Sequence, residues 1–136
     1  KDLADPDIIF NIVAIDFTLS PELEEIRDSV RTFITETVLP VENQIDGDSK
    51  EPSLDSKDRI KKLIELRKQA RKTNLWLPHM PKEWGGMGLS HVEMAMVQAE
   101  AAKSHYGPWV LNCQAPDEGN MHTLLHWATD EQKDSY

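Results

Sequence analysis

Two histidines near the C-terminal end of the chain have a spacing that suits metal binding. His122 and His126 lie four residues apart in the stretch MHTLLHWA, so a helix would place both on one face. Zinc proteases use this spacing in the motif H-E-x-x-H, where the glutamate is the general base. Position 123 is threonine instead, and Cys113 is the only thiol that could add a ligand. We therefore favour a solvated or half-buried histidine pair and predict no metal site.

A second feature with potential chemistry is the glycine cluster Gly85-Gly86-Met87-Gly88. Glycine-rich turns that open helices bind phosphates through their backbone N–H groups. A dinucleotide fingerprint needs G-x-G-x-x-G after a strand, and a P-loop needs a lysine after its last glycine. Neither pattern is present, and two prolines interrupt the preceding stretch LPHMPKEW. We interpret the cluster as a chain reversal between two helices.

The composition argues against several other kinds of site and partner. Cys113 is the single cysteine, which excludes an internal disulfide framework, and no flanking motif supports a nucleophilic role. A lone cysteine is more often a small buried hydrophobic residue. The four tryptophans are interpreted as core or interface anchors. The net charge of -9 argues against a nucleic-acid partner, because such proteins need a positive surface.

Helices must position these residues, and the first has a clear start. Ser20 is a plausible N-cap, and Pro21 at the first helical position needs no hydrogen-bond partner. Pro40 is expected to end or kink this helix. The polar stretch from Glu42 to Asp58 then predicts a mobile surface loop. One apolar stripe follows helical spacing: Leu23, Ile26, Val30, Phe33, Ile34 and Val38.

A second helix is predicted over residues 59–75. Asn74 is its candidate left-handed cap residue. Its expected apolar positions are Ile60, Leu63, Ile64, Leu66 and Ala70. Its last turns are basic, with Arg67, Lys68, Arg71 and Lys72. We interpret this basic cluster as complementing the negative end of the helix dipole rather than as a binding patch.

Two further helix starts carry capping boxes. Ser90 with Glu93, and Thr129 with Gln132, match the S/T-x-x-E/Q pattern in which two side chains satisfy backbone N–H groups reciprocally. The helix after Ser90 is expected to bury one stripe, formed by Val92, Ala95, Met96, Ala99 and Ala102. The stretch MHTLLHWA predicts a short helix before the second box.

The whole chain reads as one all-α domain. It has 136 residues, enough to bury a core without disulfide or metal support. No apolar run reaches the roughly 20 residues that a membrane span needs. Residues 1–16 are ambiguous between a short strand and an extended segment.

Three segments match, in order, the pattern of one protein family. They are LSPELEEIRDSVRTFITETVLP, LWLPHMPKEWGGMGLSHVEMAMVQAEAA and NCQAPDEGNMHTLLHWATDEQKDSY. The second follows Pro-Glu-Glu-Tyr-Gly-Gly-x-Gly-Leu-Ser, with Lys82 for the first glutamate and Trp84 for the tyrosine. Together these segments resemble the N-terminal helical domain of the acyl-CoA dehydrogenases. The third is similar to the branch whose eukaryotic members are often fused to an aminoglycoside-phosphotransferase-like kinase domain.

The resemblance implies a helical bundle, the N-terminal domain of the acyl-CoA dehydrogenase fold, over residues 17–136, with residues 1–16 as an unassigned extended lead-in. It implies that the complete enzyme adds a β domain and a C-terminal bundle. With FAD, that enzyme oxidises acyl-CoA to 2-enoyl-CoA, passes electrons to an electron-transfer flavoprotein and forms a homo-oligomer. The catalytic base and most flavin contacts would lie beyond Tyr136. No catalytic residue is therefore assigned here, and the chain alone is expected to be inactive.

By motif position, the resemblance implies that one segment walls the acyl pocket. Its residues are Asn112, Cys113, Gln114, Ala115 and Pro116, with Asn120 nearby. An irregular segment between helices suits a wall that faces a thin ligand. The alternative is that these residues only turn the chain between two helices.

Two other functions stay open at this point. One is a stand-alone helical interaction module without catalysis, in which the acidic loop and the tryptophans serve a partner. The other is a domain of an acyl-CoA oxidase-like or nitroalkane oxidase-like flavoenzyme, which passes electrons to oxygen. The compartment is equally open, whether mitochondrial, peroxisomal or bacterial cytoplasmic.

Overall fold

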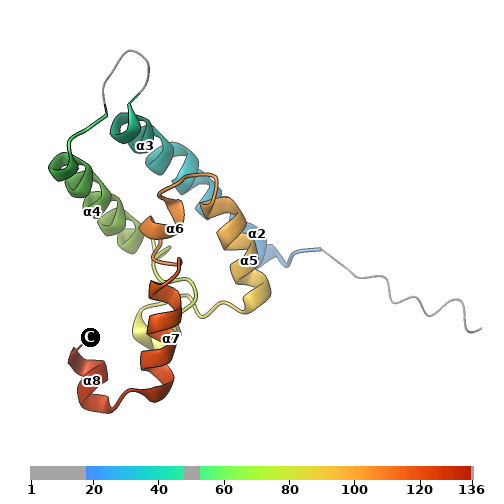
Figure 1. Cartoon of the computed structure of the whole chain (residues 1–136). Coiled ribbons are helices and arrows are strands. Elements are labelled where there is room, and N and C mark those ends of the chain that lie inside the picture. Colours follow the sequence, from blue (N-terminus) through green and yellow to red (C-terminus); the bar gives the residue numbers. More distant parts are fainter. Residues whose placement is uncertain (1–17, 48–52, 136) are drawn as a thin grey trace, which may run out of the picture.

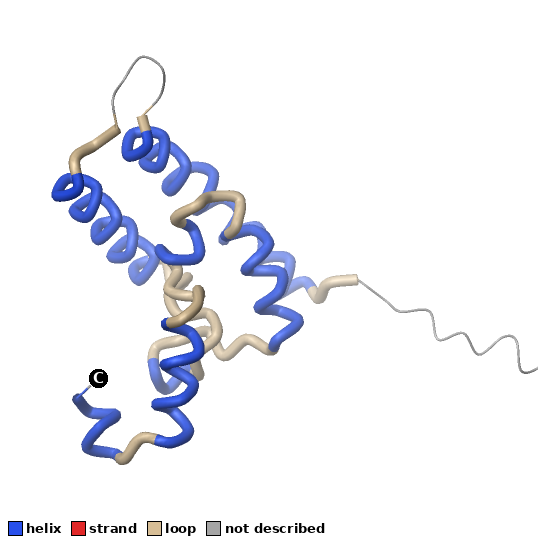
Figure 2. Tube along the Cα trace, in the orientation of Figure 1, coloured by secondary structure: helices blue, strands red, loops and turns tan. Residues whose placement is uncertain are grey.

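Helices dominate the part of the chain that the computed structural model describes, residues 18–47 and 53–135. No strand occurs within these ranges, which confirms the all-α prediction (Figure 2). The expected lead-in at residues 1–16 lies outside them. The elements in chain order are α2 (Pro21–Phe33), η1 (Ile34–Val38), α3 (Leu39–Asp46), α4 (Ser56–Lys72), η2 (Lys82–Trp84), α5 (His91–Ala101), α6 (Gly107–Val110), α7 (Asp117–Trp127) and α8 (Asp130–Ser135).

The first helix begins as its sequence predicts. The Ser20 side chain accepts a hydrogen bond from the Leu23 N–H at 3.2 Å, and Pro21 opens the helix. Pro40, however, does not end the helical run, which continues to Asp46. Just before this proline the chain forms the π-helical turn η1, where the Leu39 N–H donates to the Ile34 carbonyl five residues back. This wider turn removes the usual contact between a proline ring and the carbonyl four residues earlier.

The second predicted helix starts earlier than the sequence suggested. Asp55 caps α4, since its carboxylate accepts from the Asp58 N–H at 2.8 Å. The predicted surface loop from Glu42 to Asp58 is therefore too long, because α3 occupies its beginning and α4 its end; residues 48–52 lie outside the described ranges. The left-handed prediction for Asn74 is confirmed by its φ of 58°.

The capping box of α5 is confirmed, but its predicted buried face is wrong. The Ser90 N–H donates to Glu93 Oε2 at 2.6 Å, and the Glu93 N–H donates back to Ser90 Oγ. Val92 of the predicted stripe is 75% exposed. The face that packs on α2 instead carries Met94, Val97 and Ala101. The sequence holds two apolar stripes on this helix, and the one with the larger side chains in mid-helix is buried.

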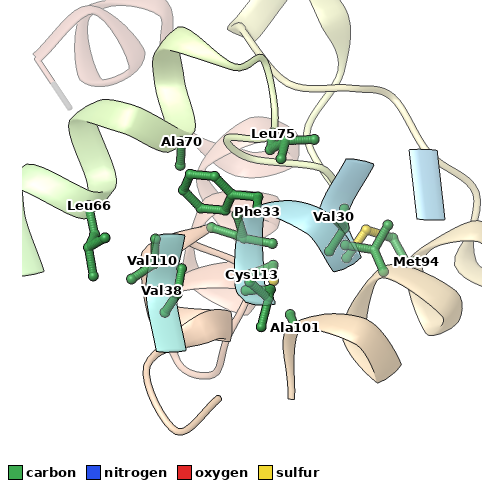
Figure 3. Packing of buried hydrophobic residues seen from close by; sticks show 13 residues of the cluster. Val30, Phe33, Val38, Leu66, Ala70, Leu75, Met94, Ala101, Val110 and Cys113 are labelled. Atoms are coloured by element: carbon green, nitrogen blue, oxygen red, sulfur yellow. The ribbon is translucent and has the colours of Figure 1, made fainter. Parts of the chain in front are cut away.

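The hydrophobic core lies among α2, η1, α4, α5 and α6 (Figure 1). We call these five elements together the body. Figure 3 shows Phe33 of α2 between side chains of α4 and α6, with Val30 facing Met94. Ile60 and Ile64 of α4 do not join this core and are 56% and 46% exposed. None of the described helices is long and apolar enough to cross a membrane.

The helices α7 and α8 form a separate projection, which we call the arm (Figure 1). The capping box between them is confirmed, because Thr129 and Gln132 exchange hydrogen bonds of 3.0 and 3.3 Å. Neither helix contains a buried residue. The arm therefore adds no side chain to the core that holds the body together.

Candidate functional site

The segment predicted to wall an acyl pocket connects the body to the arm. Asn112 and Cys113 are buried, Gln114 is half-buried, and Ala115 and Pro116 are exposed. The Ala115–Pro116 peptide bond is cis. Asn120 lies one turn into α7 and is exposed, so it does not join the buried pair. The segment thus runs from the core to the surface within five residues.

Backbone hydrogen bonds fix the buried end of this segment. Asn112 has a left-handed φ of 56°, a conformation that asparagine adopts more readily than most residues. The Cys113 N–H donates to the Pro108 carbonyl at 2.9 Å. Two residues before Cys113, the Leu111 carbonyl accepts from the Leu77 N–H at 3.0 Å. The loop after α4 and the turn after α6 are therefore joined directly below the segment.

Both polar groups of the Asn112 side chain have partners within the protein. Its carbonyl oxygen accepts a hydrogen bond from Arg67 Nη2. Its amide faces the Met121 sulfur at 3.8 Å, a weak contact that reaches the arm. Because Asn112 is 3% exposed, it supports the segment from below rather than presenting its own amide to a ligand.

Arg67 is held by two indole rings. Its guanidinium carbon lies 4.1 Å from the Trp109 ring centroid and 4.6 Å from that of Trp76. Arg71, one turn later on α4, lies 4.3 Å from the same Trp76 ring. Burial lowers the pKa of Arg67, and the Asp117 carboxylate opposes this shift. These contacts correct the view that the basic end of α4 only complements the helix dipole. The residue types were visible in the sequence, but no local pattern joins Trp109 to α4.

The Cys113 thiol is unsuited to nucleophilic chemistry as placed. The residue has no exposed surface, and burial raises the pKa of the thiol to about 12. At neutral pH it is therefore protonated, whereas the thiolate is the reactive form. Its carbonyl accepts a hydrogen bond from the Gln98 side-chain amide. The prediction of a small buried hydrophobic residue is confirmed.

A hollow of about 600 Å³ opens beside the candidate segment, between α4 and the start of α7. It is distinct from the described core. The side chains around it combine three cations, one carboxylate and several apolar groups. They belong to Ile64, Arg67, Lys68, Arg71, Trp76, Leu77, Asn112, Asp117 and Met121.

The histidine pair forms part of a packed row. The rings of His122 and His126 are stacked with centroids 6.4 Å apart, and the centroid of the His79 ring lies 5.3 Å from that of His122. His79 is 6% exposed, and neither of its ring nitrogens has a hydrogen-bond partner among the described residues. Burial lowers the pKa of His79. The geometry is that of ring packing between the body and the arm.

Glu42, Asp46 and His105 have potential metal-ligand atoms that all lie within 4.8 Å of one another. Other groups already use these carboxylates. Glu42 accepts from the Ser104 hydroxyl and from the His105 N–H, and Asp46 accepts from the Tyr106 hydroxyl at 2.8 Å. These bonds tie α3 to the loop after α5, and we assign no metal to them.

The glycine cluster bends the chain, and its backbone N–H groups are turned inward. Gly86 donates to the Pro81 carbonyl at 3.1 Å, and Gly88 donates to the Met80 carbonyl at 2.8 Å. A side chain at Gly86 would lie 2.1 Å from the Met80 oxygen, so the loop's own backbone fills that space. Gly85 and Gly88 have φ values of 78° and 68°, which glycine tolerates best. This supports a chain reversal, and the N–H groups of this cluster are already bonded to carbonyls of the preceding residues.

Comparison with known proteins shows to which family this helical arrangement belongs. A family model described as the N-terminal domain of acyl-CoA dehydrogenases matches residues 20–136. The chain belongs to the acyl-CoA dehydrogenase family. Acyl-CoA dehydrogenase family member 11 of Homo sapiens is 33% identical over 112 residues, which cover 81% of this chain and 14% of that protein. Family member 10 of Mus musculus is 31% identical over 120 residues, covering 85% and 11%.

A solved structure has the same helical arrangement. It is described as "Structure of a putative acyl-CoA dehydrogenase from Mycobacterium abscessus", and it superimposes with a TM-score of 0.71 at 30% identity. The match covers 88% of this chain and 31% of that one. The chain therefore spans a minor part of the acyl-CoA dehydrogenases that it matches.

FAD is the cofactor that the acyl-CoA dehydrogenase family implies. The glycine cluster was the sequence feature most suggestive of a nucleotide, and its backbone N–H groups are already bonded within the loop, so they do not offer donors to one. Cys113 and Asn112 are buried and occupied by protein partners. We therefore derive no flavin contact from these residues.

Proposed function

We propose that this chain acts as the N-terminal domain of a FAD-dependent acyl-CoA dehydrogenase that oxidises acyl-CoA to 2-enoyl-CoA. Residues 17–136 form that domain, and residues 1–16 precede it. In the complete enzyme FAD would supply the hydride acceptor. The chain itself supplies a wall of the acyl pocket and excludes water there, and it is inactive alone.

The observation that carries this proposal is the graded burial of the candidate segment. Cys113 is fixed in the core, and Asn112 is held by Arg67. The small residues Ala115 and Pro116 then reach the surface beside the arm. A rigid base with small exposed side chains suits contact with a narrow apolar ligand, because little side-chain freedom is lost on binding. Gln114 lies between the buried and the exposed residues of the segment. Asn120, on α7, lies beyond its exposed end.

The wider partners belong to the same proposal. Family membership supports an acyl-CoA substrate, electron transfer to an electron-transfer flavoprotein and assembly as a homo-oligomer. The exposed apolar face of α5, with Val92 at 75% exposure, offers surface for such contacts.

The test compares this chain with the complete gene product that contains it. We expect the complete protein to bind FAD, to lose flavin absorbance on addition of a matched acyl-CoA and to reduce an electron-transfer flavoprotein. Calorimetric titration of this chain alone with the matching acyl-pantetheine, which carries the acyl group without the phosphates of coenzyme A, should give no binding heat. A complete product that folds yet binds neither flavin nor acyl-CoA would support the interaction module instead. Rapid hydrogen peroxide formation would support the oxidase-like alternative.

A further inference from the structure

The basic end of α4 faces the hollow beside the candidate segment. Arg67, Lys68 and Arg71 line it, and Asp117 is the single carboxylate among the lining residues. Two positive charges are thus in excess here, in a chain whose net charge is -9. Such a local reversal of sign concentrates anions where the rest of the surface repels them.

Arg71 has donors to spare. Among residues 18–47 and 53–135 no carboxylate lies within ion-pair distance of it, whereas Arg27 and Arg31 on α2 both have acidic partners. Stacking on Trp76 occupies only the face of its guanidinium group. The N–H groups of a guanidinium lie in its plane, so they remain available for an anion.

The cations are also held in place before any ligand arrives. Arg67 lies near two indole rings, and its Nη2 is bonded to Asn112. Trp76 holds Arg71 on the same side of the helix. Fixing a long side chain in advance reduces the conformational entropy that binding would otherwise cost. Within the described part of the chain, Lys68 pairs with the exposed Glu65 at 3.5 Å, a contact too weak to withhold it from a ligand.

We propose that the hollow at the end of α4 binds a phosphate group, with Arg71 and Lys68 as its ligands and Arg67 as a fixed neighbouring charge. The excess of two positive charges matches the charge of about -1.5 to -2 on a phosphate monoester at pH 7. Arginine donates to two phosphate oxygens at once, which gives this group preference over chloride. The inference stands independently of the acyl-CoA dehydrogenase activity, because it needs only this chain.

The test is a titration of this chain with inorganic phosphate, followed by ¹H–¹⁵N NMR of the arginine Nε–H and indole N–H signals. We expect saturable shifts at Arg71 and Trp76. The variant R71Q should weaken binding by at least about tenfold, and K68Q by a smaller factor. D117N, which removes the opposing carboxylate, should tighten it. K61Q is the matched control on the same helix, since Lys61 is 76% exposed and lies outside the hollow, and it should bind as the unchanged chain does.

Parallel titrations with coenzyme A and FAD identify the source of the phosphate. Tighter binding of coenzyme A than of phosphate would point to a phosphate of that molecule, and tighter binding of FAD to its diphosphate. Equal affinity for all three would assign the site to phosphate itself. Shifts that follow ionic strength identically for phosphate and chloride would overturn the proposal. An equal loss of affinity in K61Q and R71Q would also overturn it.

Discussion

The body and the arm are both built from helices but are stabilised differently. In the body, Val30, Ile34 and Val97 have no exposed surface and pack into one core. In the arm, no residue of α7 or α8 is buried, and Trp127 is 84% exposed. The comparison teaches that a helix can be well formed by its caps yet depend on an outside surface to cover its apolar side chains. We expect the body to hold the stability of this chain and the arm to open first.

Truncating a core side chain gives the largest expected effect. Leu66 is 1% exposed, so Leu66→Ala should lower the free energy of unfolding by about 3 kcal/mol through lost burial and a cavity. Leu124→Ala in the arm is the matched control, and it should cost under about 1 kcal/mol because this side chain is only half-buried. Urea denaturation measures both. Equal losses would break the distinction between body and arm.

Acid should weaken the body through Glu100. Arg31 holds this carboxylate with hydrogen bonds of 2.8 and 3.2 Å and lowers its pKa to about 2. Because the folded pKa lies below the unfolded value of 4.5, the stabilisation is complete above pH 4.5 and is lost as the pH falls towards 2. Since Arg31 is half exposed, we expect a loss of about 1–2 kcal/mol.

Thermal unfolding midpoints across this range check the prediction. In Glu100→Gln the unfolding midpoint should vary less with pH. This variant should also be less stable than the unchanged chain at neutral pH, because the ion pair with Arg31 is lost. Glu36→Gln is the control, because Glu36 is exposed on η1, and its pH profile should match that of the unchanged chain. An unchanged pH profile in Glu100→Gln would contradict the assigned role.

The smallest expected effect lies at the junction of body and arm. His79 packs on His122 of α7, and burial lowers the pKa of His79 below 6.5. The unfolded chain therefore binds more protons below that pH, so stability should fall as the pH drops through 6.5, by up to about 1 kcal/mol. His79→Phe should remove this dependence. Hydrogen exchange of the α7 amides at pH 5.5 and 7.5 would show whether the arm opens more readily at the lower pH. Equal protection factors at the two pH values would contradict the predicted effect of His79.

The sequence predicted those features that depend on neighbours along the chain. The caps at Ser20, Ser90 and Thr129 each join residues three apart, so a short motif contains the whole interaction. The apolar spacing and the turn signals likewise predicted the all-α fold and an irregular segment between two helices, and the family resemblance implied the same fold. The role of the six candidate residues remains a prediction.

The missed features depend on residues far apart in the sequence. The buried face of α5 is chosen by α2, and both stripes of α5 are apolar enough to compete. The stacking of Arg67 on Trp109 joins α4 to α6, and no local pattern reports it. Pro40 does not end the helical run, because a π-helical turn that shows no sequence signal of its own precedes it.

The central claim is that Ala115 and its neighbours face the acyl chain, and one specificity measurement tests it directly. In the complete gene product, Ala115→Phe should lower kcat/KM for long or branched acyl-CoAs by at least about tenfold while sparing short ones, because the larger ring narrows the pocket. Lys57→Phe, at an exposed position near the start of α4 and outside the segment, is the control. We expect a shifted chain-length profile in the Ala115→Phe variant alone. An unchanged profile in a folded, flavin-containing Ala115→Phe protein would contradict it.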